Sequence, residues 1–294
     1  MQQIDLDGVR YNLPERWKDV DLERLPRLIE LIFLTPESGK MYHALIQLAL
    51  NIRPKVWRKL HQAHFSERLS ETVKRKNAEV LHLLLQQLSW LFTEPMDQQP
   101  FESLQVGKEA WLLPEPEFVT MSYGEMTDLY VHLNGFIQQQ PAGDERLDYL
   151  VATACRPRRA QGYTTDPDWN GDHREVYNEF IVRDRVATVS GLDFSLKMAV
   201  LLYVASTFKD VLSRYVLFDR PSVSDATTVG IPDETGEAYI GQGFIRNQHL
   251  LAEKGIFGTM KQTQAANAHE VLLFLEEHRA DMIVRQRAAE AERQ

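Results

Sequence analysis

The stretch "LKMAVLLYVASTF", residues 196–208, indicates the fold most directly. Its only charged residue is Lys197, and its apolar side chains would cover nearly the whole circumference of a helix. A helix that is hydrophobic nearly all round is normally buried. The stretch therefore predicts a buried helix at the centre of a helical protein.

Helical spacing of apolar residues extends over most of the remaining chain. Helix starts and stops are indicated by capping residues, prolines and glycines. The first expected helix follows an N-cap at Asp21, and the second covers 41–49. The third begins at Pro54, the fourth follows an N-cap at Ser66, and the fifth begins at a capping box of Ser122 and Glu125. Two further helices cover 144–155 and 175–187, a short one ends at Gly255, and the last begins at Lys261.

Two short stretches predict β-hairpins instead. Apolar and polar residues alternate on both sides of Asp7-Gly8, and a similar pattern surrounds Gly107-Lys108. Asp-Gly is a strong two-residue turn signal. Strands and helices do not alternate along the chain, which argues against an open parallel sheet. We therefore expect a mainly α, multi-helix globular fold with one or two small β-hairpins in the N-terminal half.

The division into domains follows the two hairpins. Residues 1–95 would hold the first hairpin and its helices, and 96–294 the second hairpin and a helical region around the buried helix. One continuous domain is the alternative. Leu13-Pro14-Glu15 and Leu113-Pro114-Glu115 each follow a hairpin and precede a helix. This match indicates either a duplication or two prolines that each end a strand.

Composition limits the classes of function. The chain has 294 residues, of which 44% are hydrophobic and 26% charged, and its formal net charge is -9. Such an acidic chain repels phosphate backbones unless its cations gather on one face. The two tight basic clusters, 74–76 and 156–159, are short and are interpreted as solvated. Nucleic acid is thus disfavoured as a partner, although a nucleic-acid-associated factor using Lys74 to Lys76 and Arg156 to Arg159 remains the second alternative.

The expected location follows from what the sequence lacks. Cys155 is the single cysteine and lies in an apolar run, which is typical of a buried structural thiol. The first residues do not form a signal peptide, and no apolar run reaches the roughly 18 residues needed to span a bilayer. We expect a cytoplasmic protein that has no membrane contact.

The most polar stretch is "TTDPDWNGDHREVYNE", residues 164–179. Asp166, Asp168, Asn170 and Gly171 fit the first half of a calcium-loop pattern. The twelfth position must supply a bidentate glutamate, but it holds Tyr177. Calcium binding is therefore disfavoured, while a metal-binding module or metal-dependent enzyme centred on 166–172 is kept as the first alternative.

A purely structural interpretation explains the same loop. Asp172 would cap the following helix with Glu175 three residues on, and Trp169 would pin the loop to the body. An acid/base site of Asp172, His173 and Glu175 is conceivable, but neighbouring residues point in different directions.

Other motifs add no chemistry. His61 and His64 lie three residues apart on a helix without an acidic partner pattern, which favours a helix surface over a metal site. The sequence has no G-x-x-x-x-G-K-[ST], no G-x-G-x-x-G after a strand and no G-x-S-x-G, the motifs of nucleotide binding and of a nucleophilic serine. We therefore assign no catalytic, cofactor-binding or metal residues and expect a protein that is not an enzyme.

Three longer stretches resemble phage proteins. The opening "LPERWKDVDLERLPRLIEL" (13–31) resembles the start of many tailed-phage and prophage proteins. The centre, "LDYLVATACRPRR" (147–159) with 168–204, and the close, "KGIFGTMKQTQAANAHEVLLFLEEH" (254–278), look like an uncharacterised family encoded in phage-like structural gene clusters.

The resemblance implies a tail-region protein, an assembly chaperone or a minor structural component, with no catalytic residues to carry over. Its partners would be other phage tail or particle proteins and, as an open alternative, further copies of itself. Contacts would involve exposed helix faces and the polar loop at 219–237. The resemblance also implies that Arg156, Arg158 and Arg159 pair with Asp168, Asp172 or Glu175.

Overall fold

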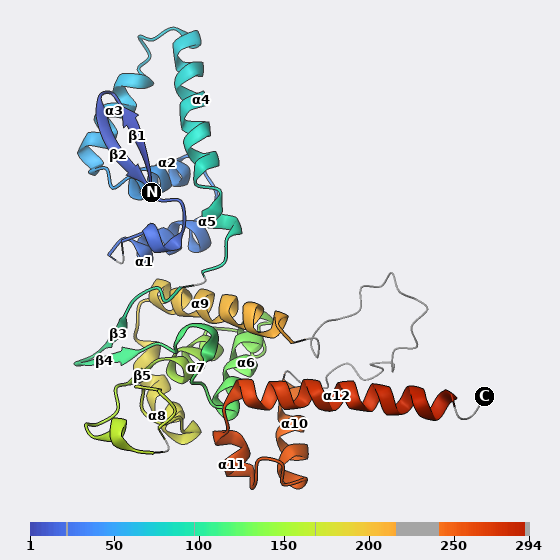
Figure 1. Cartoon of the computed structure of the whole chain (residues 1–294). Coiled ribbons are helices and arrows are strands. Elements are labelled where there is room, and N and C mark those ends of the chain that lie inside the picture. The colour runs from blue at the N-terminus through green and yellow to red at the C-terminus, as the bar shows by residue number, and fades with distance from the viewer. Residues whose placement is uncertain (22, 97, 168, 216–240, 292–294) are drawn as a thin grey trace. The chain divides into compact units, whose positions relative to one another are not determined.

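A computed structural model describes the chain except for residues 22, 97, 168, 216–240 and 292–294 (Figure 1). The predicted contact loop at 219–237 lies outside the described residues. The chain is mainly α with two small antiparallel sheets in its N-terminal half, as expected. It forms two compact units, Met1–Phe101 with Asp193–Ala199, and Glu102–Leu192 with Val200–Gln294. No described helix is both long and apolar enough to cross a membrane.

The first unit contains the predicted hairpin at Asp7-Gly8. Strands β1 (Gln2–Leu6) and β2 (Val9–Leu13) pair antiparallel, with Leu6 opposite Val9. Asp7 and Gly8 both have positive φ, 55° and 76°. A two-residue turn whose twist matches that of the flanking strands requires positive φ at both positions. The helices are α1 (Leu25–Ile29), α2 (Gly39–Ala49), α3 (Pro54–His64), α4 (Glu71–Gln87) and α5 (Trp90–Thr93).

Two predicted helix starts in this unit are wrong. No side chain caps α1; Asp21 instead pairs with Arg24, and a π-helical turn, Glu30–Leu34, follows. Helix α4 begins after Ser70 rather than Ser66, because the Ser70 hydroxyl accepts the amide hydrogen of Val73. Both serines suit a cap, so the sequence alone does not choose between them.

The second unit contains the second hairpin and a third strand. Strands β3 (Ser103–Val106) and β4 (Glu109–Leu112) turn at Gly107, which has φ +60°. The short strand β5 (Arg156–Pro157) pairs with β4 and places Arg156 opposite Leu112. The two hairpins therefore belong to separate sheets, and β5 was not predicted.

The helices of the second unit are arranged around α6. Helix α6 (Tyr123–Ile137) contacts α7 (Glu145–Ala154), α10 (Gln242–Glu253), α11 (Met260–Ala265) and α12 (Ala268–Ala291). Helix α8 (Glu179–Ser190) packs on α7. Because α6 touches several helices, residues on its different faces reach different parts of the unit.

The predicted buried helix is α9 (Phe194–Ser213). Val200, Tyr203, Val204 and Val211 have no exposed surface. The Phe208 ring lies 5.1 Å from Phe118 and 5.7 Å from Tyr130. Helix α9 is thus a core element of the second unit, as its composition predicted.

The last helix differs from the prediction. The expected single helix from Lys261 is divided, because Asn267 accepts the amide hydrogen of His269 and begins a new helix. Val271 and Leu272 are fully buried, whereas all described side chains from Arg279 to Ala291 are exposed. In Figure 1 the C-terminal half of α12 extends past the other helices of the second unit.

The two Leu-Pro-Glu tripeptides have similar surroundings. Each follows the second strand of a hairpin and precedes a 3-10 turn, Trp17–Asp19 or Pro116–Phe118. The carbonyl of Pro14 accepts a hydrogen bond from Trp90 Nε1 at 3.1 Å, and that of Pro114 accepts one from the Tyr203 hydroxyl at 2.9 Å. Duplication of the segment stays a prediction.

Candidate functional site

The polar stretch at 164–179 folds back along β5. Arg159 N donates to the His173 carbonyl at 2.9 Å, and Glu175 N donates to the Pro157 carbonyl at 2.7 Å. This backbone pairing continues the direction of the strand, so the chain cannot turn into a helix at Asp172. Helix α8 begins instead at Glu179, where Asn178 Oδ1 accepts from Phe180 N. The predicted cap at Asp172 is therefore wrong.

Three side chains hold the loop in place. Trp169 Nε1 donates to the Asp172 carbonyl at 2.9 Å, and its ring lies 5.1 Å from that of His173. Asn170 Nδ2 donates to the Thr120 carbonyl at 2.9 Å. Trp169 thus closes the loop upon itself, and Asn170 ties it to the segment before α6.

Beneath the loop lie two arginines and two carboxylates, Arg156, Arg174, Glu125 and Asp172, hereafter the buried charge quartet. Their side chains are between 2 and 6% exposed. Arg174 Nη1 donates to Glu125 Oε1 at 2.8 Å and Arg174 Nη2 to Asp172 Oδ2 at 2.9 Å. Arg156 Nη2 donates to Glu125 Oε2 at 3.0 Å and to Asp172 Oδ2 at 3.2 Å.

The two arginines of the quartet are not equivalent. Arg174 also donates to the Ala154 carbonyl at 2.9 Å. Burial acts against its charge, but Glu125 and Asp172 outweigh burial and raise the pKa of Arg174. For Arg156 burial is the larger effect and lowers its pKa, and its Nε has no hydrogen-bond partner. Four formal charges thus cancel inside the unit, with Arg174 as the better satisfied cation.

Glu125 shows why the predicted capping box is incomplete. Ser122 Oγ accepts from Glu125 N at 3.3 Å, which is the first half of the motif. The Glu125 carboxylate accepts hydrogen bonds from Arg156 and Arg174. The cap at Ser122 is therefore confirmed, while the Glu125 side chain pairs with the two arginines of the quartet instead of bonding back to the Ser122 amide.

The candidate metal ligands are partly engaged with the protein. Asn170 Oδ1 accepts from Asp172 N at 3.1 Å, and both oxygens of Asp172 accept from Arg174. Tyr177, at the twelfth loop position, donates its hydroxyl hydrogen to Asp128. Asp168 lies outside the described residues. Among the described residues, no group of three or more His, Cys, Asp or Glu is placed to hold a metal ion.

The residues of the conceivable acid/base site point to different partners. Asp172 belongs to the quartet, His173 Nδ1 lies 2.8 Å from the Tyr163 hydroxyl, and Glu175 pairs with Arg185 at 2.7 Å. Of the pairs implied by the resemblance, Arg156 with Asp172 is present. Arg159 instead donates to the carbonyl of Arg174 at 2.8 Å.

Each basic cluster contains residues that are buried or paired with an acidic side chain. Arg156 is 1% exposed, which corrects its interpretation as a solvated residue. Lys74 pairs with Glu71 at 2.8 Å, and Arg75 lies 3.8 Å from Glu79. Their charges are thus partly neutralised within the chain.

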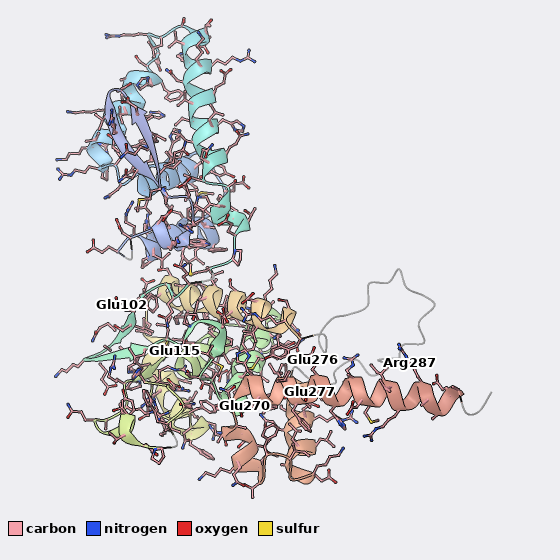
Figure 2. All side chains as sticks on the ribbon, viewed as in Figure 1. Glu102, Glu115, Glu270, Glu276, Glu277 and Arg287 are labelled. Carbon is pink, nitrogen blue, oxygen red and sulfur yellow. The ribbon has the colours of Figure 1, made fainter. Side chains whose placement is uncertain are left out.

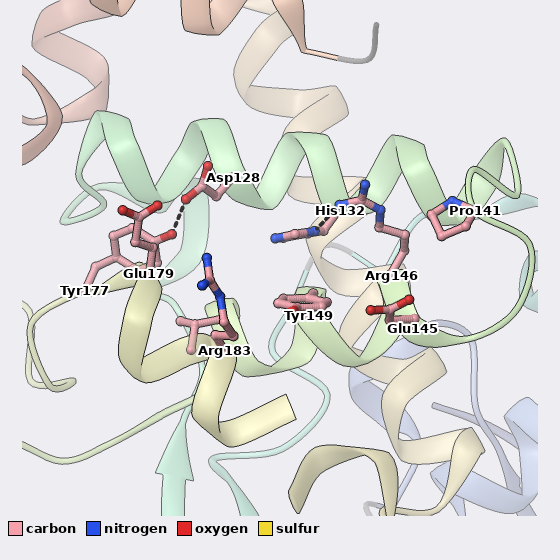
Figure 3. Close-up of a pocket in the computed structure, with 10 residues that line it drawn as sticks. Asp128, His132, Pro141, Glu145, Arg146, Tyr149, Tyr177, Glu179 and Arg183 are labelled. Carbon is pink, nitrogen blue, oxygen red and sulfur yellow. Dashed lines mark hydrogen bonds between the residues drawn. The ribbon is translucent and has the colours of Figure 1, made fainter. Parts of the chain in front are cut away.

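A polar pocket lies next to the quartet (Figure 3). Its volume is about 360 Å³, and α6, α7 and α8 with the residues before α8 form its walls. Figure 3 shows Asp128 and His132 on one wall, with Tyr149 and Arg183 across from them. His132 stacks on Tyr149 at 5.0 Å, and Arg156 lies over the Tyr177 ring at 5.6 Å, so the quartet supports this wall.

Burial shifts the titration of the pocket residues. Burial, reinforced by the nearby Arg146 charge, lowers the pKa of His132 to about 4. Burial raises the pKa of Asp128, although the Tyr177 hydroxyl acts in the opposite direction. Near neutral pH His132 is therefore uncharged. Such shifts are common at functional sites and also at buried structural ones.

The first unit has a more apolar groove of about 220 Å³ lined by Trp57, Phe65 and Leu84, among others. His61 and His64 both line it but make different contacts. The His61 ring stacks on Phe65 at 5.0 Å, while His64 Nε2 lies 2.7 Å from Asp7 Oδ2. The two histidines thus make different contacts within the groove.

Several residues of the site were missed by the sequence interpretation, above all Arg174, Asp128 and His132. Arg174 lies within the quoted loop, but a single arginine among many surface charges gives no signal of burial. Asp128 and His132 stand four residues apart on α6, a spacing that places them on one face and could have been noticed. Comparisons of the chain with protein-family models, with curated proteins and with solved structures give no match.

Proposed function

We propose that this chain is a non-enzymatic assembly or structural protein that works through contacts with other proteins in the tail region of a phage or phage-derived particle. The proposal rests on the sequence resemblance and on one structural observation. That observation is the exposed C-terminal half of α12, where Met282 is 52% and Val284 65% exposed.

Exposed apolar side chains are available to a protein partner, and contiguous groups of them are typical of binding surfaces. Met282, Ile283 and Val284 are all exposed, and because they are consecutive they point to different sides of α12. Phe180, on a different helix of the same unit, is 63% exposed. Exposed apolar side chains on several sides of α12 and on α8 suit a protein with more than one contact.

The polar loop is compatible with this role. Its most conspicuous acidic residue, Asp172, neutralises the buried Arg156 and Arg174, and Arg174 ties the loop to α6 through Glu125. In this proposal the quartet has a structural task, which is to hold the segments that bear the contact surfaces.

The experiment is deletion of the gene in a strain that produces the particle, followed by electron microscopy of the tails. We expect fewer or incomplete tails, restored by a plasmid copy of the wild-type gene. A plasmid copy carrying Met282→Asp and Val284→Asp should restore fewer tails, because charges at these positions oppose an apolar contact. Normal tails in the deletion strain would contradict the proposed function.

A further inference from the structure

The exposed end of α12 carries a face with an unusual symmetry of sequence. Residues at the spacing of one helix face, Ala280, Val284, Ala288 and Ala291, are all small or apolar and exposed. Asp281 and Arg287 flank this face, each three residues from Val284. Neither forms an ion pair with any residue that the structure describes. Figure 2 labels Arg287 near the C-terminal end of the helix.

The face is complementary to itself when it is reversed about Val284. Reversal places Ala280 opposite Ala288 and Asp281 at the same height as Arg287. Because helical residues advance by 100°, Arg285 of a reversed copy lies on the same side of the face as Asp281, whereas Arg287 of that copy lies on the other side. Asp281 of one copy and Arg285 of the other would therefore meet at both ends of such a pair, with Arg287 at the same height across the face.

We propose that two copies of this chain associate through this face, with their α12 helices antiparallel and Val284 on the two-fold axis. The alanines leave room for the two helix backbones to approach on either side of the central valine. In such a pair the same surface serves both copies, as a two-fold interface requires. Met282 points to the opposite side of the helix and remains available for another partner.

Charge complementarity favours a second copy over an unrelated partner. An unrelated protein would require no match between Asp281 and Arg285 on one side of this helix, whereas a two-fold pair uses that match twice. Short helices that are exposed on all sides are marginal in water, so pairing would also stabilise the end of α12. The inference deepens the proposed function by naming one protein contact, and it rests on the proposal that α12 is a contact surface.

A cysteine on the two-fold axis tests the geometry. Val284→Cys would meet its own copy, so mild oxidation should give a cross-linked dimer of the full chain. Met282→Cys is the matched control, since it is similarly exposed but faces away, and it should cross-link much more slowly. The native Cys155 is fully buried and its pKa is raised to about 12 by burial, so it does not compete. Equal cross-linking of both variants, or of neither, would overturn the proposal.

Charge reversal gives a second test that does not depend on cysteine. Asp281→Arg alone and the double variant Arg285→Asp with Arg287→Asp each place like charges together in their own dimers. In sedimentation velocity both should dimerise at least tenfold more weakly than the wild type. An equimolar mixture should regain the dimer, because the mixed pair joins opposite charges at both ends. Failure of the mixture to recover would count against the antiparallel register.

The two proposals can fail separately. If the dimer forms as described but deletion of the gene leaves the tails normal, only the proposed function is contradicted. A wild-type chain that sediments as a monomer at every concentration, with deletion still preventing tail assembly, would contradict only the pairing.

Discussion

Arg174 and Glu125 are 49 residues apart, yet Arg174 Nη1 donates to Glu125 Oε1 at 2.8 Å with both side chains only 2% exposed. This ion pair joins the polar loop to the first turn of α6. Since Arg156 and Asp172 complete the quartet, the interior carries two positive and two negative charges.

Removing one member of the quartet should destabilise the fold far more than removing two members of opposite charge. Arg174→Met or Glu125→Leu leaves an uncompensated buried charge, so each should lower the free energy of unfolding by about 3–5 kcal/mol. The double variant leaves Arg156 with Asp172, a neutral pair. Urea unfolding should therefore show a loss well below the sum of the single losses, whereas additive losses would show that the charges act independently.

The two arginines should differ in their contribution to stability. Arg156→Met leaves the same net charge as Arg174→Met but removes fewer hydrogen bonds, and Arg156 Nε has no partner to lose. Because a hydrogen bond to a charged group contributes about 1.5–3 kcal/mol, we expect Arg156→Met to be the less destabilising variant in urea unfolding. The opposite order would contradict the unequal hydrogen bonding of the two guanidinium groups.

The sequence predicted the elements whose signals are local. The turn at Asp7-Gly8 and the nearly all-apolar helix around Val200 are specified by residues within a few positions. The fold class followed from such signals. The start of α8 was missed because β5 pairs with the loop only in the folded unit, where Arg156 meets Leu112 from 44 positions earlier.

The buried charge quartet could not be predicted for a similar reason. Arg156 appeared within a basic run, and such runs are usually solvated. Glu125 appeared as a capping residue, which is its usual role three positions after a serine. Only the approach of α6 to the loop shows that both are buried, and that approach depends on long-range packing.

His132 should make the protein less stable in mild acid. The unfolded chain takes up a proton at this histidine near pH 6.5, but the folded chain does so only near pH 4. Protonation therefore favours the unfolded state as the pH falls through this interval. The associated loss is about 3 kcal/mol, and stability is regained above pH 6.5.

His132→Phe tests this effect, since phenylalanine keeps a ring against Tyr149 but cannot titrate. Urea unfolding across the interval should show a shallower loss of stability for the variant than for the wild type. Because the two proteins share all other titrating groups, the difference between their curves isolates His132. Parallel curves would mean that the imidazole titrates alike in both states.

Chelation should leave the stability of the purified protein unchanged. Asn170 and Asp172 already accept hydrogen bonds from protein groups, and the twelfth loop position holds Tyr177 rather than a bidentate glutamate. We expect equal melting temperatures with and without chelator and no stoichiometric metal by elemental analysis. A bound ion whose removal lowers the melting temperature would place a metal site in this loop.

Gly241 and Gly255 provide a matched test of the packing of α10 against α6. Both have positive φ, 76° and 65°, so alanine at either position should cost about 1–2 kcal/mol of backbone strain. At Gly241 an added Cβ would also lie 2.5 Å from Cγ2 of Val131, while at Gly255 it would meet nothing within 4 Å. Overpacking of this kind costs about 1–3 kcal/mol more. Gly241→Ala should therefore be clearly less stable than Gly255→Ala in urea unfolding. Equal losses would show that α10 can shift away from Val131 without penalty.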